Sequence, residues 1–258
     1  NENLQLVNYS ANTVSFNLEI ALRSDFADIF EVREHRLIRR GTIETSWNSK
    51  ERQLHTTYSN KDFQRQFIYR IIDCPSQVRY ANGRIVYEII LKPAETWTAA
   101  TRFDLLSSDR LDQHAGTDLS IVSKWHKQWK DGATQLQSSN EDFYRLYTQS
   151  VEDLGGLRLY SQIDLDEDEW LPAAGVPWYV TVFGRDSLLI SMQAMMVHPT
   201  LSLAALKHLA ALQADSRDDW RDAQPGKILH EVRHGELAHL EKIPHTPYYG
   251  SWDSTTLY

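Results

Sequence analysis

The sequence lacks paired cysteines, long apolar runs and an excess of positive charge. Cys74 is the one cysteine in 258 residues, so no intrachain disulfide can form and nothing indicates an oxidising compartment. No run of 18 or more apolar residues occurs, so we expect no membrane span. The chain also opens without the pattern of a signal peptide. Together these absences predict a cytoplasmic protein.

Lysine and arginine together number 27 against 35 aspartates and glutamates, which gives a formal net charge of -8. A general nucleic-acid binder would carry a basic surface, so we expect no nucleic-acid partner. The hydrophobic content of 41% and the charged content of 24% are ordinary for a globular protein. We expect no bound cofactor.

Residues 1–115 have the pattern of an antiparallel β-sandwich domain. Strict alternation, or enrichment in β-branched and aromatic residues, predicts strands at 14–22, 67–72, 85–91 and 97–105. Asn82-Gly83 fits a type I′ turn and predicts a hairpin between the second and third of these strands. Ser24 to Val32 interrupts the pattern as a loop or short helical turn. Many short strands separated by turn signals favour two packed sheets.

The pattern becomes helical after residue 115. Apolar residues at helical spacing predict a linker helix within residues 116–138. Ser139 and Asp142 form a capping pattern for a further helix that ends at Gly155-Gly156. The apolar face predicted for that helix consists of Phe143, Leu146, Tyr147, Val151 and Leu154. Residues 164–169 are expected to form a solvated acidic loop.

Residues 139–258 are expected to be the N-terminal part of a helical toroid. Residues 187–197 are apolar nearly all round, which predicts a buried helix. Pro199 separates this helix from a second one, rich in leucine and alanine, at 201–213. Two helices with a short connection form a helical hairpin, and several hairpins build an (α/α)6 toroid. The predicted fold is therefore a multidomain β plus α protein.

Aromatic, acidic and basic side chains gather in residues 174–258 around glycine and proline turns. Flat rings pack on pyranose surfaces, and carboxylates and guanidinium groups hold hydroxyls, so this mixture favours a saccharide site. The candidate substrate-binding residues are Trp178, Arg185, Asp186, Glu231, Arg233, Tyr249 and Trp252. The same rings are equally typical of a hydrophobic core, and Asp186 or Ser187 would serve as a helix cap.

His230-Glu231-Val-Arg-His234 matches the H-E-x-x-H motif, in which two histidines on a helix bind zinc and the glutamate is the base. Gly235 follows directly, and neither a long apolar helix nor a clear third ligand is evident. We therefore expect no metal site, and we interpret Glu231 and Arg233 as site or scaffold residues. A zinc hydrolase remains an alternative.

Asp253 lies between Trp252 and a Ser-Thr-Thr run. One interpretation is the N-cap of a short helix. The other is a general acid whose pKa is raised by aromatic burial and by a second carboxylate nearby. Because a helix N-terminus lowers the pKa of a carboxyl group, burial and the partner carboxylate would have to outweigh it.

Several segments in this order resemble the bacterial and archaeal amylo-α-1,6-glucosidase, or glycogen-debranching-enzyme-like, family. The segments that carry the resemblance are 24–33, 174–179 with 183–187, 225–236 and 248–253. The resemblance runs over nearly the whole chain. It implies a β-sandwich followed by an (α/α)6 barrel, and inverting hydrolysis of α-glucosidic bonds in an α-glucan or oligosaccharide.

Gly250-Ser-Trp-Asp253 is also similar to the acid-bearing segment of trehalases, which makes Asp253 the expected proton donor. The resemblance implies that the base is a later glutamate, and both ends of the sequence have the pattern of a cut chain. We therefore expect the 258-residue chain to be inactive by itself. The alternative from another class is a carbohydrate-binding protein that kept the fold and lost the chemistry.

Overall fold

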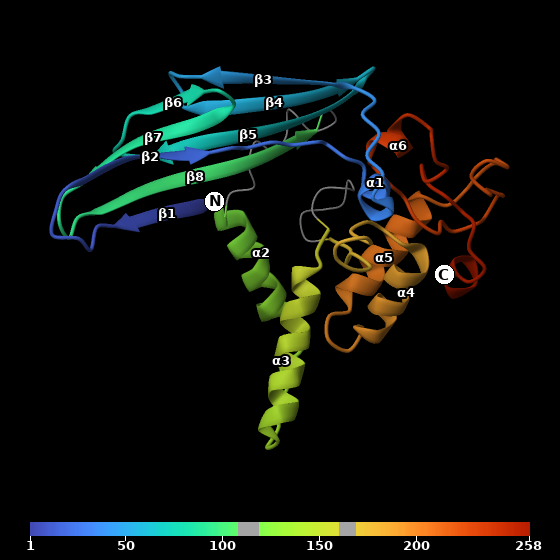
Figure 1. Cartoon of the computed structure of the whole chain (residues 1–258). Helices are drawn as coiled ribbons and strands as arrows, with labels where there is room; N and C mark the ends of the chain where they lie inside the picture. The colour runs from blue at the N-terminus through green and yellow to red at the C-terminus, as the bar shows by residue number, and fades with distance from the viewer. Residues whose placement is uncertain (108–118, 160–168) are drawn as a thin grey trace. The chain divides into compact units, whose positions relative to one another are not determined.

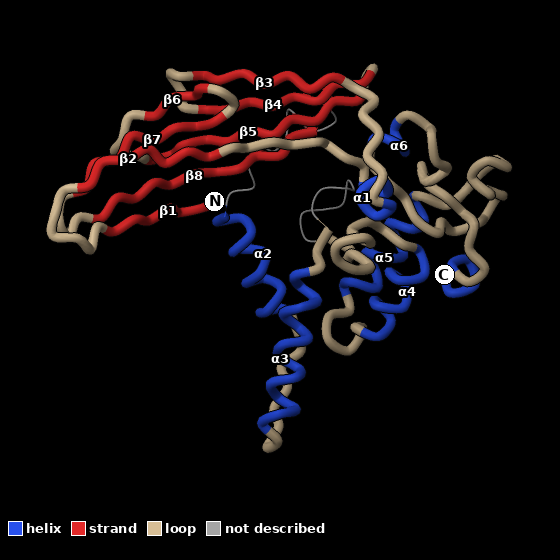
Figure 2. Tube along the Cα trace, in the orientation of Figure 1, coloured by secondary structure: helices blue, strands red, loops and turns tan. Residues whose placement is uncertain are grey.

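The computed structural model describes residues 1–107, 119–159 and 169–258 (Figure 1). The chain forms two compact units. The first comprises residues 1–27 and 35–117, and the second comprises 28–34 and 118–258. The strands, red in Figure 2, belong to the first unit, and the helices, blue in Figure 2, belong to the second. The predicted boundary at 115/116 and most of the predicted acidic loop at 164–169 lie outside the described residues.

The first unit contains two antiparallel sheets. A five-stranded sheet has the order β1-β8-β5-β4-β3, and a three-stranded sheet has the order β2-β7-β6. The predicted antiparallel β-domain is confirmed. The strands are β1 (Glu2–Val7), β2 (Val14–Ile20), β3 (Thr42–Asn48), β4 (Gln53–Asn60), β5 (Phe63–Asp73), β6 (Val78–Ala81), β7 (Arg84–Leu91) and β8 (Thr96–Ser107).

The Asn-Gly hairpin is present, with a different partner strand from the one predicted. Ala81 pairs with Arg84, and Asn82 and Gly83 have φ angles of 51° and 73°, as a type I′ turn requires. The turn joins β7 to the four-residue strand β6, whereas β5 pairs with β4 and β8 in the other sheet. Strand β6 is short and carries little alternation, so the sequence pattern did not reveal it.

The core of the first unit draws side chains from both sheets. Ile85, Tyr87 and Ile89 of β7 are buried, because alternate residues of a strand share one face. Tyr69 of β5 and Tyr87 are both fully buried, and their hydroxyls form a hydrogen bond of 2.9 Å. This bond satisfies two polar groups that would otherwise be costly to bury. The packing is that of a sandwich, with the two sheets sharing one core.

The second unit is helical. Its helices are α1 (Ile29–Glu34), α2 (Leu119–Gly132), α3 (Glu141–Gly156), α4 (Gly184–Gln193), α5 (Thr200–Ala211), α6 (Glu236–His239) and α7 (Ser254–Leu257). Helices α4 and α5 pack against each other and form the predicted hairpin. Within the described parts of the chain, no helix has the length and apolarity needed to cross a membrane.

Two details of the predicted helices are wrong. Helix α3 is capped by Asn140, whose side chain accepts a hydrogen bond of 3.0 Å from the Phe143 amide, and Phe143 and Leu146 of its predicted apolar face are exposed. Helix α4 ends at Gln193, and Met192 and Met196 are exposed although this segment was expected to be buried all round. Composition shows how apolar a segment is, whereas its neighbours decide which of its faces is covered.

Gly184, the first residue of α4, marks a close approach between two segments. A Cβ atom here would lie 2.1 Å from the carbonyl oxygen of Leu229 and 3.0 Å from Ser254 Oγ. Gly184→Ala is expected to lower the free energy of unfolding by about 1–3 kcal/mol, because backbone blocks the methyl group. Gly156→Ala is the control, since no atom lies within 4 Å of its Cβ position. Urea unfolding measures both, and equal stabilities would contradict the expectation.

Candidate functional site

Three of the motif segments meet side by side in the second unit. Glu231 forms isolated β-bridges with both Phe183 and Tyr248. The Gly184 amide donates to the His230 carbonyl at 2.9 Å, and the Tyr248 amide donates to the Glu231 carbonyl at 2.9 Å. Val182 and Leu229 of these segments belong to a hydrophobic core that also includes residues of α4 and α5. Backbone pairing therefore joins three segments that are well separated in the sequence.

Glu231 is the buried acid at this junction. Its Oε2 accepts a hydrogen bond of 2.6 Å from Arg233 Nε, and its Oε1 lies 3.1 Å from His245 Nε2. The side chains of Glu231 and Arg233 are 9% and 10% exposed. Burial by itself raises the pKa of Glu231, but the hydrogen bond from His245 and the positive charge of Arg233 outweigh burial and lower it.

Arg233 is held on several sides. Its Nη1 donates to the Trp178 carbonyl at 3.0 Å, and its guanidinium carbon lies 5.3 Å from the ring centroids of both Phe30 and Phe183. Cation–π contacts of this kind are strongest where water is excluded. Trp178 thus contributes a backbone oxygen to the cluster, and the residue as a whole is half-buried.

Asp253, the expected proton donor, lies beside Arg185. Arg185 Nη1 lies 3.4 Å from Asp253 Oδ2, and Arg185 Nε lies 3.8 Å from Asp186 Oδ2. The Ser251 hydroxyl donates to Asp253 Oδ1 at 2.8 Å. The structure therefore brings Arg185, Asp186 and Asp253 together in a partly exposed group.

The environment predicted for Asp253 is wrong in one respect. We expected aromatic burial to raise its pKa, but the Ser251 hydrogen bond and the positive charge of Arg185 lower it. Trp252 is 100% exposed and does not cover the carboxyl group. Asp253 is also the residue that precedes α7, although its side chain makes no capping hydrogen bond.

The candidate aromatic residues lie in different environments. Tyr249 belongs to the hydrophobic core, and its hydroxyl donates to the Leu212 carbonyl at 2.9 Å. Its ring is therefore covered by protein, contrary to a role as a ligand platform. The exposed Trp252 leaves its ring faces open, and Trp178 is half-buried. The hydroxyl of Tyr248 donates to Asp222 at 2.7 Å.

The H-E-x-x-H segment does not have the geometry of a zinc site. Residues 230–234 are non-helical, so the two histidines do not lie one turn apart on a helix. Glu231 is engaged by Arg233 and His245, and the His230 ring packs against Phe183 at 5.6 Å. Among the described residues, no group of three or more potential ligands could hold a metal ion.

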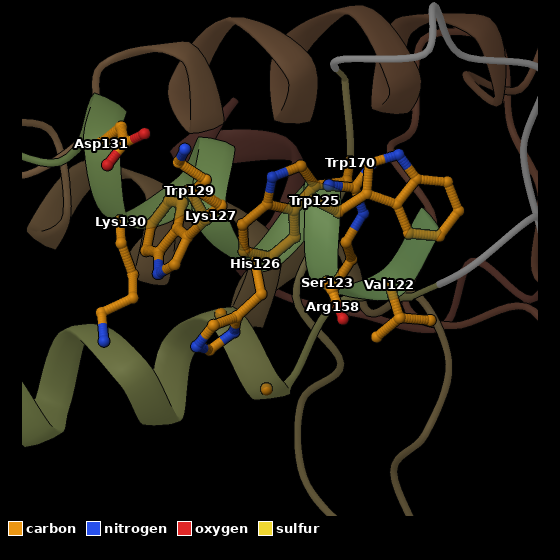
Figure 3. A pocket seen from close by; sticks show the side chains of 12 residues that line it. Val122, Ser123, Trp125, His126, Lys127, Trp129, Lys130, Asp131, Arg158 and Trp170 are labelled. Carbon is orange, nitrogen blue, oxygen red and sulfur yellow. The ribbon is translucent and has the colours of Figure 1, made fainter. Parts of the chain in front are cut away.

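A separate cavity of about 630 Å³ lies in the second unit between α2, α3 and the segment around Trp170 (Figure 3). None of the candidate site residues lines it. Arg158 lies over the ring of Trp125 at 4.7 Å and over that of Trp170 at 5.5 Å. Trp129 and Trp170 are buried and pack edge to face at 5.1 Å, so they belong to a small core.

One comparison with known proteins gives a match, in the N-terminal part of the chain. Residues 1–102 match the family model for the N-terminal domain of (some) glycogen debranching enzymes. This region is similar to the N-terminal domain of glycogen debranching enzymes. The predicted resemblance to the glycogen-debranching-enzyme-like family is confirmed by this match. A search of curated proteins found no match.

The range that matches the family model includes a helix, α1, that folds with the second unit. Residues 28–34 lie inside the matched range, yet they belong to the unit that contains Glu231 and Asp253. This segment carries part of the family resemblance, but its sequence does not indicate that Phe30 lies beside Arg233. His245 was missed entirely, because a single histidine beside a proline carries no pattern that points to a glutamate fourteen residues away.

The lowered pKa of Glu231 predicts a specific pH dependence of the free energy of unfolding. Ionised Glu231 stabilises the fold above its ordinary pKa of 4.5, and this contribution is lost as the pH falls through the lower pKa of the folded state. Glu231→Gln removes the titrating group, so we expect a shallower fall in the free energy of unfolding below pH 4.5. Urea unfolding at a series of pH values measures the slope. The exposed Glu141→Gln should keep the wild-type slope, and an unchanged slope in Glu231→Gln would contradict the expectation.

Proposed function

We propose that this chain forms part of a glycoside hydrolase of the amylo-α-1,6-glucosidase type. In the full-length protein it acts on α-glucosidic bonds with inversion, and the chain's ligand is an α-glucan or oligosaccharide. The observation that carries the proposal is the group of Arg185, Asp186 and Asp253 in a chain that opens with a glycogen debranching enzyme N-terminal domain. The proposal includes an (α/α)6 toroid, of which α4 and α5 would form one hairpin.

The role of Asp253 as general acid requires a change of environment on substrate binding. A carboxyl group with a lowered pKa is ionised at neutral pH and has no proton to donate. A saccharide bound over Asp253 would exclude water, and desolvation favours the neutral form of a carboxyl group. The fully exposed ring of Trp252, one residue away, offers a surface on which such a sugar would pack.

Inverting hydrolysis also needs a base. The second carboxylate of an inverting glycosidase lies about 6.5–9.5 Å from the acid, with room for the attacking water. Glu231 is already bound by Arg233 and His245, which makes it a poor base for water. We propose that the base lies outside these 258 residues.

The test compares the 258-residue chain with the full-length protein. Reducing-sugar release from glycogen and from linear maltooligosaccharides is expected with the full-length protein alone. Loss of α-1,6 branches with inverted anomeric configuration, followed by NMR, identifies the reaction. Turnover by the 258-residue chain would contradict the proposal that the base lies outside these residues. No turnover by either protein would contradict the proposal that the full-length protein is a glycosidase.

One observation favours a second candidate, a carbohydrate-binding protein without catalysis. The hydrogen bond from Ser251 and the charge of Arg185 keep Asp253 ionised. An ionised Asp253 beside Arg185 is suited to holding hydroxyls, as a binder requires. The two candidates differ in whether Asp253 is needed for turnover.

A further inference from the structure

Helix α1 is joined to the rest of the second unit by Asp28, the residue that precedes it. The amide of Phe30 donates to Asp28 Oδ1 at 3.1 Å, and the amide of Leu237 donates to Asp28 Oδ2 at 3.1 Å. In return the Asp28 amide donates to Glu31 Oε2 at 3.3 Å, which completes a reciprocal cap. One buried carboxylate therefore holds the start of α1 against the start of α6.

Gly235 keeps this junction close. A Cβ atom at Gly235 would lie 2.4 Å from Asp28 Oδ2, so a side chain here would push the carboxylate away. Gly235 directly precedes α6 and follows the segment that carries Glu231 and Arg233. The connection therefore fixes α1 next to the buried cluster.

The ring of Phe30 contacts both donors to Glu231. Its centroid lies 5.3 Å from the guanidinium carbon of Arg233 and 5.4 Å from the ring centroid of His245. Arg233 and His245 each serve a different oxygen of the Glu231 carboxylate. A single apolar side chain thus lies against the two groups that neutralise and hydrogen-bond the buried acid.

The orientation of His245 depends on packing more than on hydrogen bonds. Its Nδ1 is buried and has no hydrogen-bond partner within the described residues. The proton of the neutral ring therefore belongs on Nε2, where it is donated to Glu231. With one hydrogen bond to hold it, the ring is kept in place by Phe30 and by Tyr248, whose centroid lies 5.3 Å away.

We infer that Phe30 is a positioning residue for the candidate site: its ring holds Arg233 and His245 on Glu231, and Asp28 attaches α1 to the start of α6. The debranching-enzyme N-terminal domain thereby supplies part of the site. The part of this inference that concerns sugar binding rests on the proposed function, whereas the part that concerns the contacts around Glu231 does not.

The decisive experiment measures the titration of Glu231 by carbon-13 NMR of the 258-residue chain, with the resonance assigned by its loss in Glu231→Gln. Phe30→Leu keeps an apolar side chain and removes the ring. We expect the lowered pKa of Glu231 to rise toward its ordinary value in Phe30→Leu and to stay low in Phe30→Tyr. Phe143→Leu on α3, where the ring is exposed, is the matched control.

Fluorinated phenylalanines at position 30 separate positioning from simple packing. Fluorination weakens the attraction of the ring for a cation and changes its size little. We expect the Glu231 pKa to rise in steps with the number of fluorines, and this readout remains available if Phe30→Leu does not fold. An unchanged Glu231 titration in folded Phe30→Leu, or across the fluorinated series, would overturn the inference.

Maltohexaose titrations of the same variants link the arrangement to sugar binding. We expect Phe30→Leu to bind it roughly threefold to thirtyfold more weakly than wild type, the range expected for loss of a cation–π contact. Wild type that binds no maltohexaose, with Glu231 still responding to Phe30, would count against the proposed function and support positioning. Wild-type affinity in Phe30→Leu would overturn the link to the site.

Discussion

Asp253→Asn is expected to lower turnover of α-glucans by the full-length protein by about 10²–10⁴-fold, the usual contribution of a general acid. Asparagine keeps the shape of the side chain and can still accept the Ser251 hydrogen bond, but it cannot donate a proton to the leaving oxygen. Because Arg185 lies 3.4 Å from Asp253, some loss of sugar affinity is also expected. The measurements are kcat and KM on glycogen and on linear maltooligosaccharides.

The matched control is Asp219→Asn. Asp219 forms an exposed ion pair with Arg217 and lies outside the candidate site, so kcat and KM should both stay at their wild-type values. If Asp253→Asn protein binds sugar but no longer hydrolyses it, this supports the glycosidase over the carbohydrate-binding protein. Full turnover by Asp253→Asn would remove Asp253 from the chemistry.

The second large effect is expected for Arg233→Ala. The substitution leaves the Glu231 carboxylate buried without its main counter-charge, and breaking a buried ion pair in this way costs about 3–5 kcal/mol. Urea unfolding should show this loss in the free energy of unfolding at neutral pH. Arg217→Ala is the control, because Arg217 and Asp219 are 74% and 80% exposed and such pairs contribute about 0–1 kcal/mol.

A double variant tests the physical reason for this loss. Glu231→Gln removes the uncompensated charge, so Glu231→Gln with Arg233→Met should be more stable than Arg233→Met alone. A coupling free energy of about 0.5–3 kcal/mol is expected for residues in direct contact. Strictly additive effects would show that Arg233 stabilises the fold through Phe30 and Phe183 and not through Glu231.

The sequence predicted strands β2, β5, β7 and β8 of the first unit, because strand patterns are local, and it did not predict β1, β3, β4 or β6. Alternation in 85–91 corresponds to the buried face of β7, and Asn82-Gly83 forms the predicted type of turn. Both features depend on residues within a few positions of each other. The register that pairs β7 with β2 and β6 arises from contacts between strands, which no local pattern contains.

For the candidate site, the sequence suggested which residues to consider but not how buried each of them is. The segments with Arg185, Glu231 and Asp253 lie together in the structure, while the roles of these residues stay predictions. Burial was wrong for two residues: Tyr249 is in the core, and Asp253 is partly exposed beside hydrogen-bond donors that lower its pKa. An aromatic residue has the same letter in a core and in a binding surface, so composition cannot separate the two.

By itself, the sequence determined the antiparallel β-domain, the order of helices α2 to α5 and the family resemblance of the N-terminal region, because periodicity and short motifs depend on neighbouring residues. Tertiary structure alone decided that Phe30 lies against Arg233 and His245, and that Glu231 is buried between two donors. Those contacts join residues up to about two hundred positions apart. Their energies depend on distance and on the exclusion of water, which folding creates.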